Sequence, residues 1–91
     1  MTNANVEYLI RYFNNESKAG SDLGWPEYSA KCAEYANFLQ STRDLAQLVT
    51  MFKATNFENK VIFFETLEQD AERPDLAELL GYDEYVNTYY A

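Results

Sequence analysis

The chain has 91 residues, of which 47% are hydrophobic and 16% aromatic, and its formal net charge is −8. A chain of this size buries roughly 60 to 68% of its unfolded surface, so the composition predicts one compact domain over residues 1–91 and excludes a disordered chain or a second domain. The lone Cys32 excludes an internal disulfide and neither a secretion signal nor a membrane span is recognisable, so we expect a soluble, cytoplasmic protein that binds no membrane.

A helix is predicted near the start of the chain, beginning at about residue 3 or 5. Four apolar residues recur at the spacing that places them on one helix face: Val6, Leu9, Ile10 and Phe13. The polar segment 14–24 contains two glycines and is expected to form the longest loop of the chain. We expect Trp25 to pin the end of this loop to the core.

Two further helices are predicted in the middle of the chain. Pro26 suits the first position of a helix because its missing N–H needs no partner there, and an apolar stripe then runs to about Gln40. Ser41 and Asp44 resemble a capping pair for the next helix. Its apolar residues repeat the helical spacing as far as about Ala54.

A fourth helix is predicted after Asn56, which can cap it. Residues 60–64 include Val-Ile-Phe-Phe, a run that is also typical of a short buried strand; helix is favoured because no second strand candidate exists to pair with it. Pro74 restarts the chain in a short helix that Gly81 ends in a left-handed conformation, and a final segment covers 83–90. The sequence therefore predicts an all-α fold, a compact single-domain bundle of four to six short helices.

The negative charge is concentrated in the last third of the chain. Residues 1–57 hold six acids and five bases, whereas residues 58–91 hold nine acids and two bases. A field of this sign attracts cationic surfaces and repels anionic membranes, so the expected partner is a basic protein, of the kind that binds or cuts nucleic acids. Direct binding of nucleic acid is disfavoured, because seven scattered cations release too few counterions.

Acids and tyrosines of this segment are the candidate partner-binding residues. They are Glu65, Glu68, Glu72, Asp75, Glu78, Asp83, Glu84, Tyr82 and Tyr85. Carboxylates at helical spacings rise about 4.5 to 10 Å along the axis, which suits a groove that binds phosphates, and tyrosine rings are effective interface anchors. The alternative is a solvated acidic face with tyrosines that close the core. The chain would then be an adaptor module, either monomeric or homodimeric, that binds through apolar surfaces.

No catalytic or cofactor signature is recognisable. The chain contains no His, which removes the usual imidazole base and the commonest metal ligand and excludes Ser-His, Cys-His and ordinary zinc sites. Neither a phosphate-binding glycine loop nor an EF-hand pattern occurs. We therefore expect a protein that is not an enzyme and that needs no cofactor or metal, with paired carboxylates as the one remaining route to catalysis.

In length, acidity, single cysteine and helical pattern, the chain resembles the small inhibitors that phages and other mobile elements make against host nucleases, including anti-restriction and anti-CRISPR DNA mimics. It is similar in the same general way to acidic immunity proteins that neutralise nuclease toxins. The resemblance covers overall character and no residue motif, and what it implies is a non-enzymatic protein inhibitor.

Overall fold

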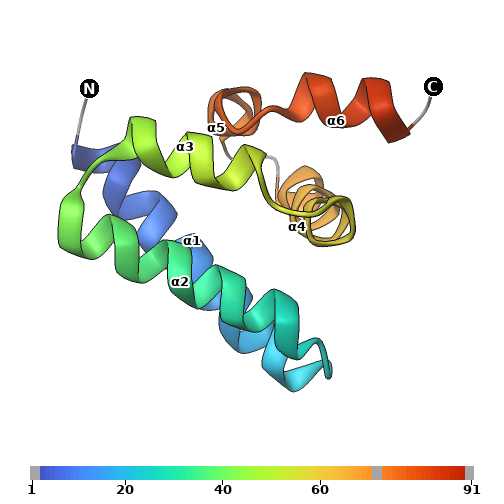
Figure 1. Cartoon of the computed structure of the whole chain (residues 1–91), viewed down its shortest axis with the longest axis horizontal. Helices are drawn as coiled ribbons and strands as arrows, with labels where there is room; N and C mark the ends of the chain where they lie inside the picture. Colours follow the sequence, from blue (N-terminus) through green and yellow to red (C-terminus); the bar gives the residue numbers. More distant parts are fainter. Residues whose placement is uncertain (1–2, 71–72, 90–91) are drawn as a thin grey trace. The chain divides into compact units, whose positions relative to one another are not determined.

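The computed structural model describes residues 3–70 and 73–89, with the side chains of residues 4–66 and 73–89, and these residues form helices and no strand (Figure 1). The six helices are Asn3–Asp22 (α1), Pro26–Thr42 (α2), Leu45–Lys53 (α3), Phe57–Asp70 (α4), Pro74–Leu79 (α5) and Tyr82–Tyr89 (α6). The predicted all-α class is confirmed, and residues 60–64 are helical, within α4. Contacts divide the chain into two compact units, residues 1–48 and 49–91, with the boundary inside α3.

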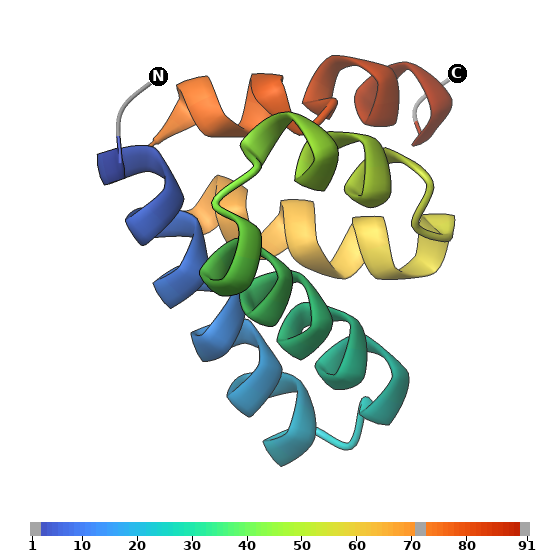
Figure 2. The same ribbon diagram turned by 60° about the vertical axis from the view of Figure 1, so that its left-hand side comes forward.

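In the first unit, α1 and α2 lie side by side, run in opposite directions and are joined by a short turn (Figure 2). The apolar face predicted for α1 is confirmed, and Phe13 meets Tyr35 of α2 edge to face, with 5.5 Å between ring centroids. The buried apolar residues of this unit are Val6, Leu9, Ile10, Phe13, Tyr28, Cys32, Tyr35, Ala36, Leu39, Leu45 and Leu48.

The prediction of a loop at residues 14–24 is wrong, because α1 continues through most of this polar segment. Its polar groups find partners on α2. The buried Tyr28 hydroxyl donates a hydrogen bond to Glu16 Oε1 at 2.5 Å. Beside this bond, the Ser17 hydroxyl donates to the Ser29 carbonyl at 2.9 Å, and the Ser29 hydroxyl donates to the Ser17 carbonyl at 2.7 Å. Packing against a partner helix therefore overrides the local preference for a loop.

The turn between α1 and α2 is the exposed end of the first unit. Gly24 has a φ of +77°, in the left-handed region that favours glycine. The expectation that Trp25 pins this segment to the core is wrong: the side chain is 43% exposed, and its ring meets the Tyr28 ring edge-on at 6.3 Å. Because the preceding residues are helical, the turn is too short to carry Trp25 back over the core.

The boundary between α2 and α3 differs slightly from the prediction. α2 runs through Ser41 to Thr42, so Ser41 does not cap α3. Asp44 caps it instead, since its Oδ1 accepts a hydrogen bond from the backbone N–H of Gln47 at 3.1 Å. Arg43 ends α2 with a φ of 57°, a left-handed C-cap.

Gly20 allows a close approach of α1 to α2. A Cβ at this position would lie 3.0 Å from Tyr28 Cδ2 and 3.3 Å from the Ser29 backbone nitrogen. Gly-to-Ala changes inside a helix usually stabilise it by about 1 kcal/mol. Here the added methyl group would crowd the ring of Tyr28, which is buried and has little room to move, and the Ser29 backbone, so we expect Gly20→Ala to lower the free energy of unfolding by about 1 to 3 kcal/mol.

Urea unfolding followed by circular dichroism checks this prediction, with Ser21→Ala as the matched control. Ser21 is exposed on the same helix turn, so its replacement should be neutral or slightly stabilising. If Gly20→Ala is as stable as the unchanged chain, the glycine is not needed for the approach of the two helices.

The second unit combines the end of α3 with α4, α5 and α6. Asn56 caps α4 as predicted, because its Oδ1 accepts a hydrogen bond from the backbone N–H of Asn59 at 3.0 Å. Gly81 separates α5 from α6 with a φ of +95°, which confirms its predicted left-handed conformation. The core is rich in aromatic rings; its buried apolar residues are Phe52, Phe63, Phe64, Leu76, Leu80 and Tyr85.

Candidate functional site

The acidic side chains that the structure describes in the second unit lie at its surface. Six of them have described side chains, and all six are exposed: Glu58, Glu65, Asp75, Glu78, Asp83 and Glu84. Two members of the predicted set lie wholly or partly outside the described part of the chain. For Glu68 only the backbone is described, and for Glu72 neither backbone nor side chain is. The structure therefore places five of the seven predicted acids, and it places each of the five in solvent.

The two acids of α4 whose side chains are described, Glu58 and Glu65, point away from the core of the unit. Glu58 and Glu65 are seven residues apart, so they are separated by about 10 Å along the helix and by about 20° around it. This side of α4 lies opposite the buried Phe63 and Phe64. The remaining described acids are on α5 and α6, which pack on α4 and on each other.

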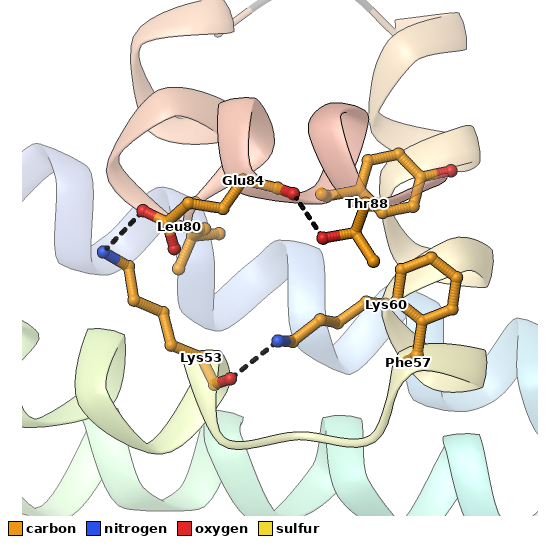
Figure 3. Close-up of a pocket in the computed structure, with 8 residues that line it drawn as sticks. Lys53, Phe57, Lys60, Leu80, Glu84 and Thr88 are labelled. Carbon is orange, nitrogen blue, oxygen red and sulfur yellow. Dashed lines mark hydrogen bonds and ion pairs between the residues drawn. The ribbon is translucent and has the colours of Figure 1, made fainter. Parts of the chain in front are cut away.

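The cations of the second unit are engaged by the unit's own atoms. Arg73 holds Asp75 with two contacts, Nε to Oδ1 at 3.1 Å and Nη2 to Oδ2 at 2.9 Å, and this hydrogen bonding keeps the pKa of Asp75 below its ordinary value. Lys53 Nζ lies 3.5 Å from Glu84 Oε1. Lys60 Nζ donates a hydrogen bond to the Lys53 carbonyl at 2.6 Å, at the end of α3 (Figure 3).

Four exposed carboxylates of this unit form no ion pair with any described residue. They are Glu58, Glu65, Glu78 and Asp83. Residues 49–91 hold nine acids and three bases, a net charge of −6. Because these four charges are not neutralised within the described structure, they contribute fully to the field outside the unit. We call them the unpaired acids.

Glu58 is not among the candidate partner-binding residues predicted from the sequence, although its spacing of seven residues from Glu65 already predicts that the two share a helix face. Asp75 and Glu84, which were in the set, each face a cation from the same unit. Their charges are partly neutralised, so they are weaker candidates than the unpaired acids.

The two predicted tyrosines are packed to different extents. Tyr85 is 5% exposed and lies against Phe57 and Phe64, at 5.8 and 4.9 Å between ring centroids. The expectation that Tyr85 anchors a partner is therefore corrected, because its ring closes the core of this unit. Tyr82 is half-buried, with its ring 5.6 Å from Phe64. Among the described residues of this unit, the exposed rings are instead Phe57 (40%) and Tyr89 (44%), with 6.0 Å between their centroids.

A small pocket lies beside Phe57 (Figure 3). Its volume is about 70 Å³, and it is lined by Lys53, Phe57, Lys60, Leu80, Gly81, Glu84, Tyr85 and Thr88. Sites for small organic ligands usually measure about 300 to 1,000 Å³, so this pocket has room for a few water molecules or a small ion. The two lysine ammonium groups make it locally basic within an acidic unit.

Comparison of the chain with protein-family models, with curated proteins and with solved structures found no match. Within the described residues, no cluster of three or more His, Cys, Asp or Glu side chains could hold a metal ion. None of the helices described has the length and apolar character needed to cross a bilayer. The candidate site is the exposed acidic surface that the structure describes in the second unit, together with the exposed rings of Phe57 and Tyr89.

Proposed function

We propose that this chain is a small inhibitor that presents its unpaired acids to the basic, nucleic-acid-binding surface of a target protein. The observation that carries the proposal is the set of four exposed carboxylates that no described cation neutralises, in a unit with a net charge of −6. In a target that binds phosphates through Lys and Arg side chains, the carboxylates of this chain would occupy the positions of the phosphates. Occupation of the groove then blocks access by the nucleic acid.

The spacing of the acids on α4 supports imitation of a polyanion. Glu58 and Glu65 are separated by about 10 Å along the helix axis, and phosphates of one DNA strand follow each other every 3.4 Å or so, so the pair matches about three phosphate steps. Packing of α4 against α5 and α6 holds these positions before the target arrives. A pre-organised surface loses little entropy on binding, and its charge accelerates the encounter.

The function proposed is non-enzymatic and of the DNA-mimic type, the class to which anti-restriction, anti-CRISPR and nuclease-immunity proteins belong. Inhibition requires only that the target's basic groove be occupied. Because the contacts pair exposed charges, affinity should fall steeply as salt rises.

Displacement by DNA tests the proposal. The immobilised chain is expected to capture basic nucleic-acid-binding proteins from a bacterial lysate at low salt, and duplex DNA should release them at concentrations that leave the ionic strength unchanged. Glu58→Lys/Glu65→Lys should reduce the capture at least about tenfold, because two attractive contacts become repulsive. Mass spectrometry of the released proteins and filter assays of their DNA binding are the measurements.

Asp22→Lys/Glu34→Lys is the matched control. Both residues are exposed and belong to the first unit, so the variant has the same net charge as Glu58→Lys/Glu65→Lys but keeps the unpaired acids. It should retain most of the capture, and circular dichroism should show both variants folded. An equal loss in the two variants would mean that net charge alone drives capture, and captured proteins that DNA does not displace would contradict the mimicry.

An adaptor function is the second candidate, and one observation in the first unit favours it. Leu23 and Trp25 are 63% and 43% exposed at the turn between α1 and α2. Next to them is an open groove of about 460 Å³, lined by Ser17, Ser21, Gly24, Pro26, Ser29, Ala30 and Ala33. A partner whose capture is lost in Trp25→Ala but kept in Glu58→Lys/Glu65→Lys would support this function instead.

A further inference from the structure

The pocket beside Phe57 brings two lysine side chains together (Figure 3). Lys53 is the last residue of α3, and Lys60 belongs to the first turn of α4. The Lys60 ammonium group donates a hydrogen bond to the Lys53 carbonyl at 2.6 Å, and this bond holds the ammonium group at the pocket. Because an ammonium group has three N–H donors, two further donors of Lys60 remain for other acceptors.

The charge of Lys60 is not neutralised within the described residues. In the second unit, Arg73 and Lys53 each face a carboxylate, whereas Lys60 faces a neutral carbonyl oxygen. Among the described residues that line the pocket, Glu84 is the one acid, and it faces Lys53. The pocket therefore combines two positive charges with one negative charge.

The ion pair between Lys53 and Glu84 is loose. Lys53 Nζ lies 3.5 Å from Glu84 Oε1, which is longer than the roughly 2.7 to 2.9 Å of a charge-assisted hydrogen bond. The two side chains are 42% and 72% exposed, and solvent screens ion pairs as exposed as this one. An anion that enters the pocket can thus replace the Glu84 carboxylate at the Lys53 ammonium group.

We propose that this pocket binds a small, doubly charged oxyanion, inorganic phosphate or sulfate. Its ligands are the two ammonium groups, which supply N–H donors and positive charge from two sides. The ion carries more charge than the single carboxylate of Glu84, so it attracts the ammonium groups more strongly. The inference does not depend on the proposed function, because the unpaired acids take no part in it.

The size of the pocket favours a free ion over the phosphate group of a larger molecule. Its volume is about 70 Å³, well below the roughly 300 Å³ at which sites for organic ligands begin. Adenosine monophosphate should therefore bind more weakly than inorganic phosphate does. Equal or tighter binding of adenosine monophosphate would overturn the assignment to a free ion.

An NMR titration of the isotope-labelled full chain tests the site. Sodium phosphate replaces sodium chloride at constant pH and ionic strength, and the amide signals of Gly81 and Thr88, which line the pocket, are followed. Both signals should shift and reach a plateau, and sulfate should act on the same signals. A drift without a plateau that affects amides throughout the chain alike would overturn the proposal.

Two single changes in the pocket should act in opposite directions. Lys60→Met keeps an unbranched side chain but removes the charge, so it should weaken phosphate binding at least about fivefold. Glu84→Gln removes the competing charge at nearly the same size, so it should strengthen binding about threefold. Circular dichroism checks both folds, and Glu84→Gln decides the outcome alone if Lys60→Met does not fold. Unchanged affinity in the folded Lys60→Met variant, or no gain in Glu84→Gln, would contradict the site.

Lys31 and Glu34 of the first unit provide matched controls. Their Nζ and Oε1 atoms are also 3.5 Å apart, and both side chains are likewise exposed. Lys31→Met and Glu34→Gln make the same changes of charge as the two pocket variants and should leave phosphate binding unchanged. If they change it as much as the pocket variants do, the net charge of the chain governs phosphate binding and the proposal is wrong.

Discussion

Replacement of Phe64 by alanine is expected to lower the free energy of unfolding by about 3 to 5 kcal/mol. Phe64 is 1% exposed. Its ring lies 4.9 to 5.7 Å from those of Phe52, Phe63, Tyr82 and Tyr85. The change removes a large side chain from the meeting point of α3, α4 and α6, and the rigid neighbouring rings cannot collapse fully into the cavity.

Phe57→Ala is the matched control for this prediction. It removes the same side chain from the same helix, but Phe57 is 40% exposed, so we expect a loss of about 1 kcal/mol. Urea unfolding followed by circular dichroism measures both. Since small domains are stable by about 5 to 15 kcal/mol, Phe64→Ala should also show a clearly lower thermal midpoint. Equal losses at the two positions would contradict the described core.

The second large effect is a loss of stability at alkaline pH. Burial raises the pKa of the Cys32 thiol from its ordinary value of 9.0 to about 12, with a smaller contribution from the nearby Glu16 carboxylate. Burial, and then the neighbouring Cys32, likewise raise the pKa of Tyr28 above its ordinary value of 10.0. Both groups are therefore neutral in the folded chain at pH values where the unfolded chain has released their protons.

The direction of the effect follows from proton counting. Between about pH 9 and pH 12 the folded chain binds more thiol protons than the unfolded chain, so the free energy of unfolding falls as pH rises through this window. Below the window the contribution of Cys32 is fully present. A shift of this size corresponds to a loss of about 4 kcal/mol at the upper end of the window from the thiol alone.

Urea unfolding at a series of pH values above neutrality checks this prediction, with Cys32→Ala as the comparison. The variant loses some packing at every pH, but its stability should fall less steeply with pH because the thiol no longer titrates. Tyr28→Phe removes the second group and should also flatten the curve, at the cost of leaving the buried Glu16 carboxylate without its donor. Parallel curves for the unchanged chain and Cys32→Ala would show that the thiol does not titrate from a buried state.

Most helices could be predicted from the sequence because their signals are local. The apolar residues of α1 recur with the helical period. Asn56 caps α4 by accepting a hydrogen bond from the backbone N–H three residues later, and Gly81 supplies the left-handed turn after α5. Each of these features depends on residues that are close in the chain. The all-α class and the expected range of four to six helices follow from them.

The second half of α1 could not be predicted in this way. Its local composition is polar and contains Gly20, and the groups that hold it in the helix come from residues 28 and 29 on the following helix. The wrong expectation for Trp25 has the same origin. A loop over residues 14–24 would have left enough chain to fold the Trp25 ring back onto the core, whereas the short turn does not. In both cases the deciding contact joins residues that are distant in the sequence.

The features of the candidate site likewise fall into two groups, those that could be predicted from the sequence and those that depend on contacts between distant residues. The sign, the size and the position along the chain of the net charge follow from the residue counts, since nine of fifteen acids fall in residues 58–91 whatever the fold. In contrast, it is the packing of the helices that brings Lys53 to Glu84, buries Tyr85 and places Phe57 against Tyr89 at the surface. The physical reason is that charge is a sum over residues, whereas neutralisation and exposure depend on which side chains the packing of the helices brings together.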